Sequence, residues 1–172
     1  MKTLKIKKIT PLIKKALDYA TEKHLGQSRK FSGEPYIVHP MAVAELANKY
    51  DGYNEDKICA ALLHDVVEDC NVSVAEIAKE FNSHIAGIVK ELTSNKADIE
   101  SAGKTEYMKK HMVNMSKEAL TIKLADRLNN MMDNPTQKMK DATIEIINYL
   151  MANRTLSFPQ KNLADDIMDV IS

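Results

Sequence analysis

The chain has 172 residues, enough for one domain with a single substantial hydrophobic core. Lys plus Arg and Asp plus Glu number 24 each, and this zero net charge argues against a non-specific nucleic-acid-binding protein, which would be basic. No apolar stretch approaches membrane-spanning length, and no apolar signal segment follows the lysine-rich beginning. We therefore expect one cytoplasmic domain over residues 1–172, with neither a membrane nor a nucleic acid as partner.

The first part of the sequence predicts two helices separated by a loop. Thr10 and Pro11 are typical of the N-cap and first turn of a helix. Residues 28–36 contain a glycine and a proline and predict a loop. A second helix can begin at Pro40 and continue towards Gly52.

A third helix is predicted from Asn54 through to Cys70. A short fourth helix would follow with a capping box that begins at Ser73, and Asn82 or Ser83 would open a fifth.

The two cysteines, Cys59 and Cys70, are predicted to be reduced. On one continuous helix they would lie eleven positions apart, roughly 16 Å at the helical rise. This separation exceeds the reach of a disulfide bond.

The second half of the sequence continues the helical pattern. Residues 94–104 are polar and contain a glycine, which predicts a mobile loop. Helices are predicted over 106–115 and 117–132, and again over about 137–154 and 159–171. Because strand-like alternation is almost absent, we expect an all-α fold.

Four polar residues interrupt the apolar third helix: His64, Asp65, Glu68 and Asp69. On a continuous helix, residues four apart would stack in two neighbouring columns. Burying one histidine and three carboxylates costs several kcal/mol unless something compensates for it. A divalent cation would do so, since imidazole and carboxylate groups both bind Mn²⁺, Fe²⁺ or Zn²⁺.

Two further residues strengthen the prediction of a metal site. His39 lies at a predicted loop-to-helix junction, directly before Pro40, and Asp126 lies inside an apolar helical stretch. With His64 and Asp65 they give two nitrogen and two oxygen ligands. For the His64-Asp65 dipeptide alone, a hydrogen-bonded core histidine would be the better interpretation.

Several blocks of the sequence match, in the same order, the blocks of a known family. They are His24-x-x-Gln27-x-Arg29-Lys30, Gly33-Glu34-Pro35-Tyr36-Ile37-x-His39-Pro40, Ala60-Ala61-Leu62-Leu63-His64-Asp65-x-x-Glu68-Asp69 and Lys123-Leu124-Ala125-Asp126-Arg127-Leu128. Over about residues 20–132 the chain resembles the HD superfamily of metal-dependent phosphohydrolases, and most closely its RelA/SpoT-like branch. The resemblance implies a single-domain, all-α helical bundle of the HD type.

The resemblance also implies roles for individual residues. One metal ion, usually Mn²⁺ in this branch, would be held by His39, His64, Asp65 and Asp126. Glu68 and Asp69 would position and deprotonate the attacking water, unless they only orient the histidines.

Substrate-binding residues are implied partly by resemblance and partly by charge. Arg29 and Lys30 match a pair that contacts the substrate's phosphates, and Asn130 matches an asparagine near the nucleotide. Lys123 and Arg127 could offset the negative charge of the carboxylates, although Arg127 could equally pair with one of them.

The expected reaction is hydrolysis of guanosine 3′,5′-bis(diphosphate) at its 3′-pyrophosphate, with release of pyrophosphate. Three alternatives stay open: the same site acting on another nucleotide, such as NADPH at its 2′-phosphate or a nucleoside phosphate; a non-catalytic module that binds metal and nucleotide; and a helical protein whose polar residues pair internally. Two features depart from the branch, both near its nucleotide. Asn129 stands where histidine or tyrosine is usual, and residues 92–96 match the branch only loosely.

Overall fold

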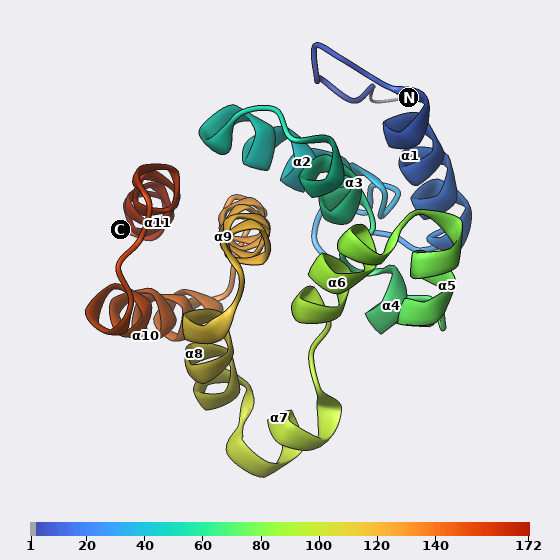
Figure 1. The fold of residues 1–172 in the computed structure, drawn as a ribbon. Coiled ribbons are helices and arrows are strands. Elements are labelled where there is room, and N and C mark those ends of the chain that lie inside the picture. Colours follow the sequence, from blue (N-terminus) through green and yellow to red (C-terminus); the bar gives the residue numbers. More distant parts are fainter. Residues whose placement is uncertain (1–2) are drawn as a thin grey trace.

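The computed structural model describes residues 3–172 as helices joined by turns and loops, without a strand in that range (Figure 1). This confirms the predicted all-α class. The expected domain, residues 1–172, includes residues 1 and 2, which lie outside the described part, and its bounds stay a prediction. In chain order the helices are α1 (Pro11–Lys23), α2 (Val38–Asp51), α3 (Glu55–Leu62), α4 (Val66–Asp69), α5 (Val74–Glu80), α6 (Ser83–Leu92), α7 (Lys96–Ala102), α8 (Lys104–Asn114), α9 (Lys117–Met131), α10 (Gln137–Asn153) and α11 (Phe158–Ile171).

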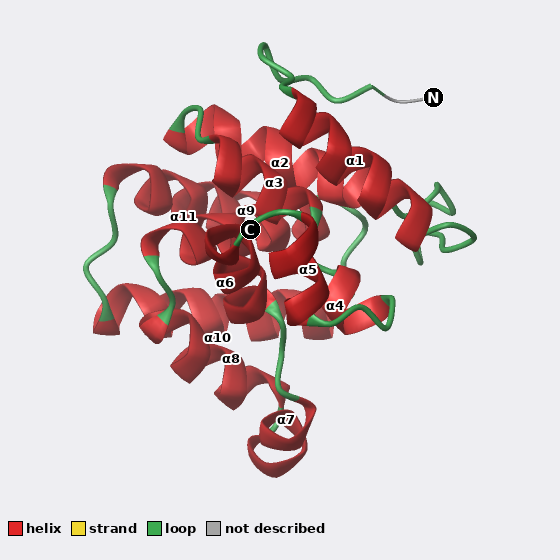
Figure 2. Cartoon of the chain, turned by 45° about the vertical axis from the view of Figure 1, so that its right-hand side comes forward, coloured by secondary structure: helices red, strands yellow, loops and turns green. Residues whose placement is uncertain are grey.

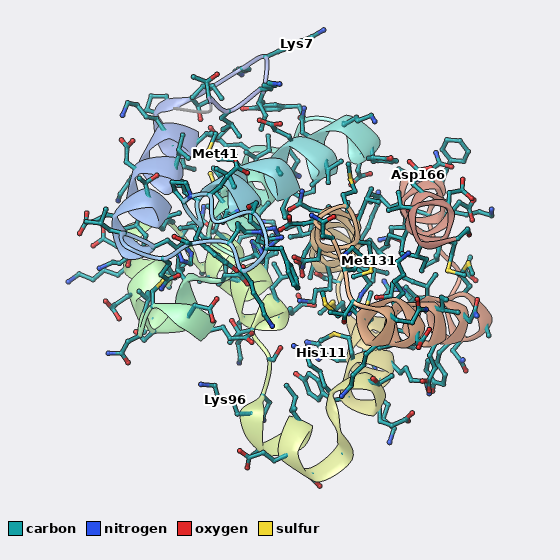
Figure 3. All side chains as sticks on the ribbon, turned by 180° about the vertical axis from the view of Figure 1, so that it is seen from behind. Lys7, Met41, Lys96, His111, Met131 and Asp166 are labelled. Atoms are coloured by element: carbon teal, nitrogen blue, oxygen red, sulfur yellow. The ribbon has the colours of Figure 1, made fainter. Side chains whose placement is uncertain are left out.

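Helix α9 forms the centre of the bundle. It packs against α2, α3, α6, α10 and α11, so helices from both halves of the sequence surround it (Figures 1 and 2). Leu120, Ile122 and Leu124 on this helix are fully buried. Lys7 and Lys96 extend away from the bundle, whereas the buried Met131 lies among the helices (Figure 3). None of the helices formed by residues 3–172 is both long and apolar enough to cross a membrane.

Side-chain caps begin several helices where the sequence predicts them. The hydroxyl of Thr10 accepts a hydrogen bond from the backbone N–H of Ile13, and Pro11 occupies the first turn of α1. Ser73 and Glu76 form the predicted capping box of α5. Each such bond satisfies an N–H that has no partner within its own helix.

Helix α2 begins at Val38, two residues before the predicted start at Pro40. A proline fits this first turn because the N–H groups there have no acceptor within the helix. The earlier start places His39 in the first turn, where its N–H donates to the Tyr36 carbonyl at 2.9 Å.

The predicted continuous helix from Asn54 to Cys70 is wrong. Helix α3 ends at Leu62, a turn follows, and α4 begins at Val66. His64 Nδ1 donates to the Ala61 carbonyl at 2.8 Å, the carbonyl that would accept from residue 65 in a continuous helix. His64 therefore lies in the turn rather than on a helix with Glu68, whereas Asp65 and Asp69 keep helical spacing, since the Asp69 N–H donates to the Asp65 carbonyl at 2.9 Å.

This turn also removes the geometric reason given for the reduced cysteines. The prediction itself holds, because Cys59 and Cys70 are both free.

The predicted mobile loop over residues 94–104 is also wrong, because residues 96–102 form α7. The side chain of Asn95 accepts from the N–H groups of Ala97 and Asp98, and Gly103 follows the helix with φ of +83°. The helix buries none of its residues and extends from the bundle beside α8 (Figure 1). Without a buried face it has no apolar periodicity from which it could be predicted.

Candidate metal centre

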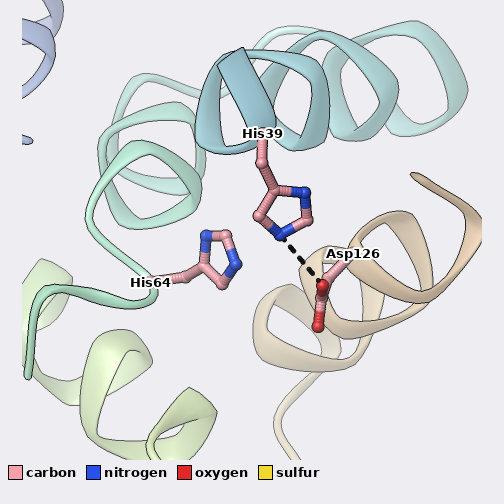
Figure 4. Close-up of side chains that lie close together, drawn as sticks. All are labelled: His39, His64 and Asp126. Carbon is pink, nitrogen blue, oxygen red and sulfur yellow. Dashed lines mark ion pairs between the residues drawn. The ribbon is translucent and has the colours of Figure 1, made fainter. Parts of the chain in front are cut away.

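Three side chains from distant parts of the sequence meet inside the bundle. His39 comes from the first turn of α2, His64 from the turn after α3, and Asp126 from the middle of α9 (Figure 4). All three are buried, and one donor atom from each lies within 4.8 Å of the others. His39 Nε2 is 3.2 Å from Asp126 Oδ1. These residues can hold a divalent cation.

Each of the two imidazole rings is fixed by a hydrogen bond at its Nδ1 atom. His39 Nδ1 donates to Asn129 Oδ1 at 2.7 Å, and His64 Nδ1 donates to the Ala61 carbonyl at 2.8 Å. With the proton on Nδ1, the Nε2 atom of each neutral ring has a lone pair that can bind a cation. Sequence reasoning noted Asn129 only as a departure from the family pattern and missed its contact with His39.

Asp65 lies beside the three clustered residues. Its Oδ2 atom is 2.9 Å from His64 Nε2 and 3.7 Å from His39 Nε2. Tyr36 donates its hydroxyl to the same oxygen at 2.7 Å. Tyr36 belongs to the Gly33–Pro40 block, but its residue type alone did not reveal this role.

Both oxygens of Asp126 have partners on α9. Lys123 Nζ lies 3.0 Å from Oδ2, and Asn130 Nδ2 donates to Oδ1 at 2.6 Å. Burial disfavours the charged form of Asp126, but Lys123 and the two histidines hold its pKa well below the usual value. The carboxylate is therefore ionised.

The electrostatics of the cluster favour a bound cation. His64 Nε2 is buried and makes no hydrogen bond within residues 3–172, although a carboxylate oxygen of Asp65 is close to it. Burial lowers the pKa of His64, but Asp65 and Asp126 more than offset this and raise it to about 9 in the metal-free protein. Nitrogen lone pairs facing carboxylates need a positive charge between them, which a proton or a metal ion supplies. The donor set thus fits a divalent cation.

A pocket of about 650 Å³ opens onto this cluster, a volume typical of small-molecule sites. Glu68 and Asp69 line it together with His39, Asp65 and Asp126. Most of its other lining residues come from α8, α9 and α10.

The structure places the predicted catalytic carboxylates at this pocket without contact to the imidazoles. Glu68 Oε2 accepts a hydrogen bond from the Ser94 N–H at 3.0 Å, which anchors it to the segment between α6 and α7. Burial raises the pKa of Asp69, and the neighbouring carboxylates of Asp65 and Glu68 raise it further. A raised pKa brings the Asp69 carboxylate closer to the range in which a general base accepts a proton near neutral pH.

Three predicted substrate-binding residues line the pocket: Lys123, Arg127 and Asn130. Arg127 donates to Thr143 Oγ1 at 3.0 Å, and no carboxylate of the described chain lies within ion-pair distance of its guanidinium. Lys104 and Lys138 also line the pocket. Sequence reasoning missed these two lysines, because no motif distinguishes them from solvated surface lysines.

The other two predicted substrate-binding residues are not among the residues that line the pocket. Arg29 is paired with Asp133, and Lys30 is exposed with its ammonium group 5.5 Å from the centre of the Phe31 ring. Contact of Arg29 and Lys30 with a substrate therefore stays a prediction.

The sequence pattern of the HD domain matches residues 16–155, which is most of the chain. The chain belongs to the HD domain family. The HD domain found here contains every residue of the cluster and every residue that lines the pocket.

Curated relatives of this HD domain include long and short proteins. It is 40% identical over 125 residues to a probable guanosine-3′,5′-bis(diphosphate) 3′-pyrophosphohydrolase of Synechocystis; the match covers 70% of this chain but only 16% of that protein. It is 37% identical over 124 residues to the guanosine-3′,5′-bis(diphosphate) 3′-pyrophosphohydrolase MESH1 of Xenopus tropicalis, which covers 71% of this chain and 69% of that protein. The chain thus spans a small part of the former and most of the latter.

A solved structure shares the whole fold of the HD domain. The structure described as that of a metazoan ortholog of SpoT that hydrolyses ppGpp superposes with a TM-score of 0.80 at 28% identity. The match covers 95% of this chain and 97% of that one. This confirms the predicted single-domain helical bundle of the HD type.

Proposed function

We propose that this chain is a divalent-metal-dependent phosphohydrolase that removes pyrophosphate from the 3′ position of guanosine 3′,5′-bis(diphosphate). The observation that carries the proposal is the convergence of His39, His64 and Asp126 at one end of a pocket whose walls carry both carboxylates and cations. The short relative and the superposed structure, both described as hydrolases of this nucleotide, support the substrate. A cytoplasmic location is part of the proposal.

The metal would be held by His39, His64 and Asp126, with Asp65 as a fourth ligand. A divalent cation bound there would polarise a phosphoryl oxygen and make the attacking water more acidic. Mn²⁺ is our choice on the family resemblance, while the donor set also suits Fe²⁺ or Zn²⁺.

Glu68 and Asp69 would handle the water. The hydrogen bond from Ser94 fixes the Glu68 carboxylate, which suits it to orient a water molecule at the pocket wall. Asp69, with its raised pKa, would take the proton. Both follow the proposed ligands His64 and Asp65 by four residues and line the same pocket as His39, Asp65 and Asp126.

The cationic wall would bind the substrate's phosphates. Burial lowers the pKa of Lys123, but Asp126 and Asp65 raise it more, so this lysine stays protonated. Arg127 presents a guanidinium without a carboxylate partner among the described residues. Phosphoryl transfer depends mainly on positioning and on stabilising negative charge, which these two residues supply.

The test is a substrate panel with the purified chain and Mn²⁺: guanosine 3′,5′-bis(diphosphate), NADPH and simple nucleoside phosphates. We expect pyrophosphate from the first substrate and far slower release of phosphate from the others. Phosphate release from NADPH alone would move the function to the 2′-phosphate of that nucleotide. Binding of nucleotide without any turnover would indicate a non-catalytic module.

Two variants separate the metal role from the water role. Asp126→Asn should lose both metal binding and turnover, whereas Glu68→Gln should keep the metal and lose at least about 100-fold in kcat, as general-base and water-positioning groups do. Full activity of Glu68→Gln would remove Glu68 from the mechanism.

A further inference from the structure

Asp133, just beyond the end of α9, forms an ion pair that the proposed chemistry leaves unexplained. Its Oδ2 atom lies 2.8 Å from one terminal nitrogen of Arg29 and 3.0 Å from Arg29 Nε. The Asp133 side chain is only 21% exposed and the Arg29 side chain 12%. Solvent therefore screens this ion pair less than a surface pair. The pair joins the loop at residues 28–36 to α9.

The backbone on both sides holds the pair in place. Asp133 donates its N–H to the Asn130 carbonyl at 3.3 Å, and Asn134 follows with φ of +46°, a left-handed conformation that asparagine tolerates. On the loop side, Arg29 donates its N–H to the Glu34 carbonyl at 2.8 Å and accepts from the Gly33 N–H at 3.0 Å. Both partners therefore start from fixed positions.

Arg29 also fixes the amide of Asn130. The same terminal nitrogen of Arg29 that contacts Asp133 donates to Asn130 Oδ1 at 3.0 Å. Because the amide oxygen faces the guanidinium, the amide nitrogen faces Asp126 and donates to its Oδ1 atom at 2.6 Å. That oxygen is also the one 3.2 Å from His39 Nε2.

The orientation of the Asn130 amide matters for the candidate metal site. A flipped amide would turn its oxygen towards the ionised Asp126, and a donor would be replaced by an unfavourable contact between two acceptors. Arg29 opposes the flip, because its own donors would then face the amide NH₂ group. Asp133 in turn keeps Arg29 at this position.

We propose that Asp133 and Arg29 are positioning residues, which lock the Asn130 amide as a donor to Asp126 and so set the affinity of the metal site. The inference rests on the proposed function only in requiring that the site binds a metal. In this interpretation the guanidinium of Arg29 forms its ion pair with Asp133 rather than with a substrate phosphate. Asp133 lies outside every sequence block that suggested the family.

The test is Mn²⁺ binding, measured by calorimetry on the wild type, Asp133→Asn, Asn130→Ala and the double variant. Removing hydrogen-bonded partners behind metal ligands typically weakens metal binding 10- to 100-fold. We expect Asp133→Asn to weaken Mn²⁺ binding about tenfold, to lower kcat at limiting Mn²⁺, and to recover near wild-type kcat at saturating Mn²⁺ with little change in the KM for the nucleotide. In the Asn130→Ala background the same substitution should have less than about a twofold effect, because the two act through one contact.

Three further variants complete the design. Arg29→Lys should reproduce the loss, since an ammonium lacks the fork that reaches both Asp133 and Asn130. Asp133→Glu should retain most of the affinity. Asp165→Asn, which breaks an exposed ion pair with Lys161 at 2.8 Å, is the matched control and should bind Mn²⁺ like the wild type.

Wild-type Mn²⁺ affinity in Asp133→Asn would overturn the inference, as would additive losses in the double variant. A rise in KM alone for Arg29→Lys would overturn it too, and would make Arg29 a substrate contact. A wild-type protein that binds no metal would overturn the proposed function and this inference together. The two failures are therefore distinguishable.

Discussion

At the scale of single residues, each histidine of the candidate metal site makes a hydrogen bond through Nδ1, which leaves Nε2 for a metal ion. His64 uses the Ala61 carbonyl, and His39 uses the side chain of Asn129. A backbone acceptor cannot be removed by mutation, but Asn129 can. The contribution of ring orientation to metal binding is therefore measurable at His39.

We predict that Asn129→Ala weakens Mn²⁺ binding about tenfold, because the His39 ring loses the acceptor that fixes its orientation and tautomer. Asn129→Asp, which keeps an acceptor, should bind at least as tightly as the wild type. Calorimetric titration measures both. Asn153→Ala, at an exposed asparagine whose side chain donates to the Tyr149 carbonyl of its own helix, is the control. Equal affinities for Asn129→Ala and the wild type would show that the ring needs no support.

A second prediction concerns protons at His64. Its pKa of about 9 in the metal-free protein means that the ring is protonated at pH 7.5, whereas metal binding requires a free Nε2. Binding should therefore release about one proton at pH 7.5, and affinity should rise with pH until about pH 9. Titrations in two buffers with different ionisation enthalpies count the proton. Binding without proton release would place the metal away from His64.

Residue types and their order in the sequence were enough to predict the four candidate ligands, since buried imidazoles and carboxylates need a reason to be buried. They were not enough for Tyr36, Asn129 and Asp133. Their contacts depend on which side chain lies opposite, and that is fixed only by the packing of loop and helices.

At the scale of elements, the turn between α3 and α4 is what makes the site possible. Neighbouring residues on a helix point about 100° apart, whereas the turn brings His64 Nε2 and Asp65 Oδ2 to 2.9 Å. The apolar pattern around them continues without a break, so the sequence predicted one helix. The turn contains a hydrogen bond from the His64 side chain to the Ala61 carbonyl, which apolar periodicity does not encode.

The loop at residues 28–36 supports the two carboxylates of the site through hydrogen bonds. Through Tyr36 it contacts Asp65, and through Arg29 and Asn130 it reaches Asp126. Its position as a loop was predictable from its glycine and proline, but its contacts with both carboxylates were not.

Helix α7, which lies in the sequence between the pocket-lining residues Ser94 and Lys104, is predicted to be less stable than α9. It buries no residue, whereas α9 buries most of its length, so its backbone hydrogen bonds should open far more often. In a hydrogen–deuterium exchange experiment, the amides of residues 96–102 should therefore exchange early and those of residues 119–125 last. Protection of α7 equal to that of α9 would mean that another surface covers it.

At the scale of the whole molecule, the fold brings two distant segments, the start of α2 and the turn after α3, to α9 to build one site. The candidate ligands at residues 39, 64 and 126 span half of the chain, and the bundle places one donor atom of each within 4.8 Å of the others. The family resemblance predicted this convergence, and the all-α class followed from helical spacing alone. The shape of the pocket did not follow, because α8 and α10 contribute much of its wall without a recognisable motif.

The most direct test of the account is the location of a bound metal. Crystals grown with Mn²⁺ should give one strong anomalous difference peak between His39, His64 and Asp126, with Asp65 beside it. A peak elsewhere, or none at saturating Mn²⁺, would contradict the claim that these residues form the metal centre.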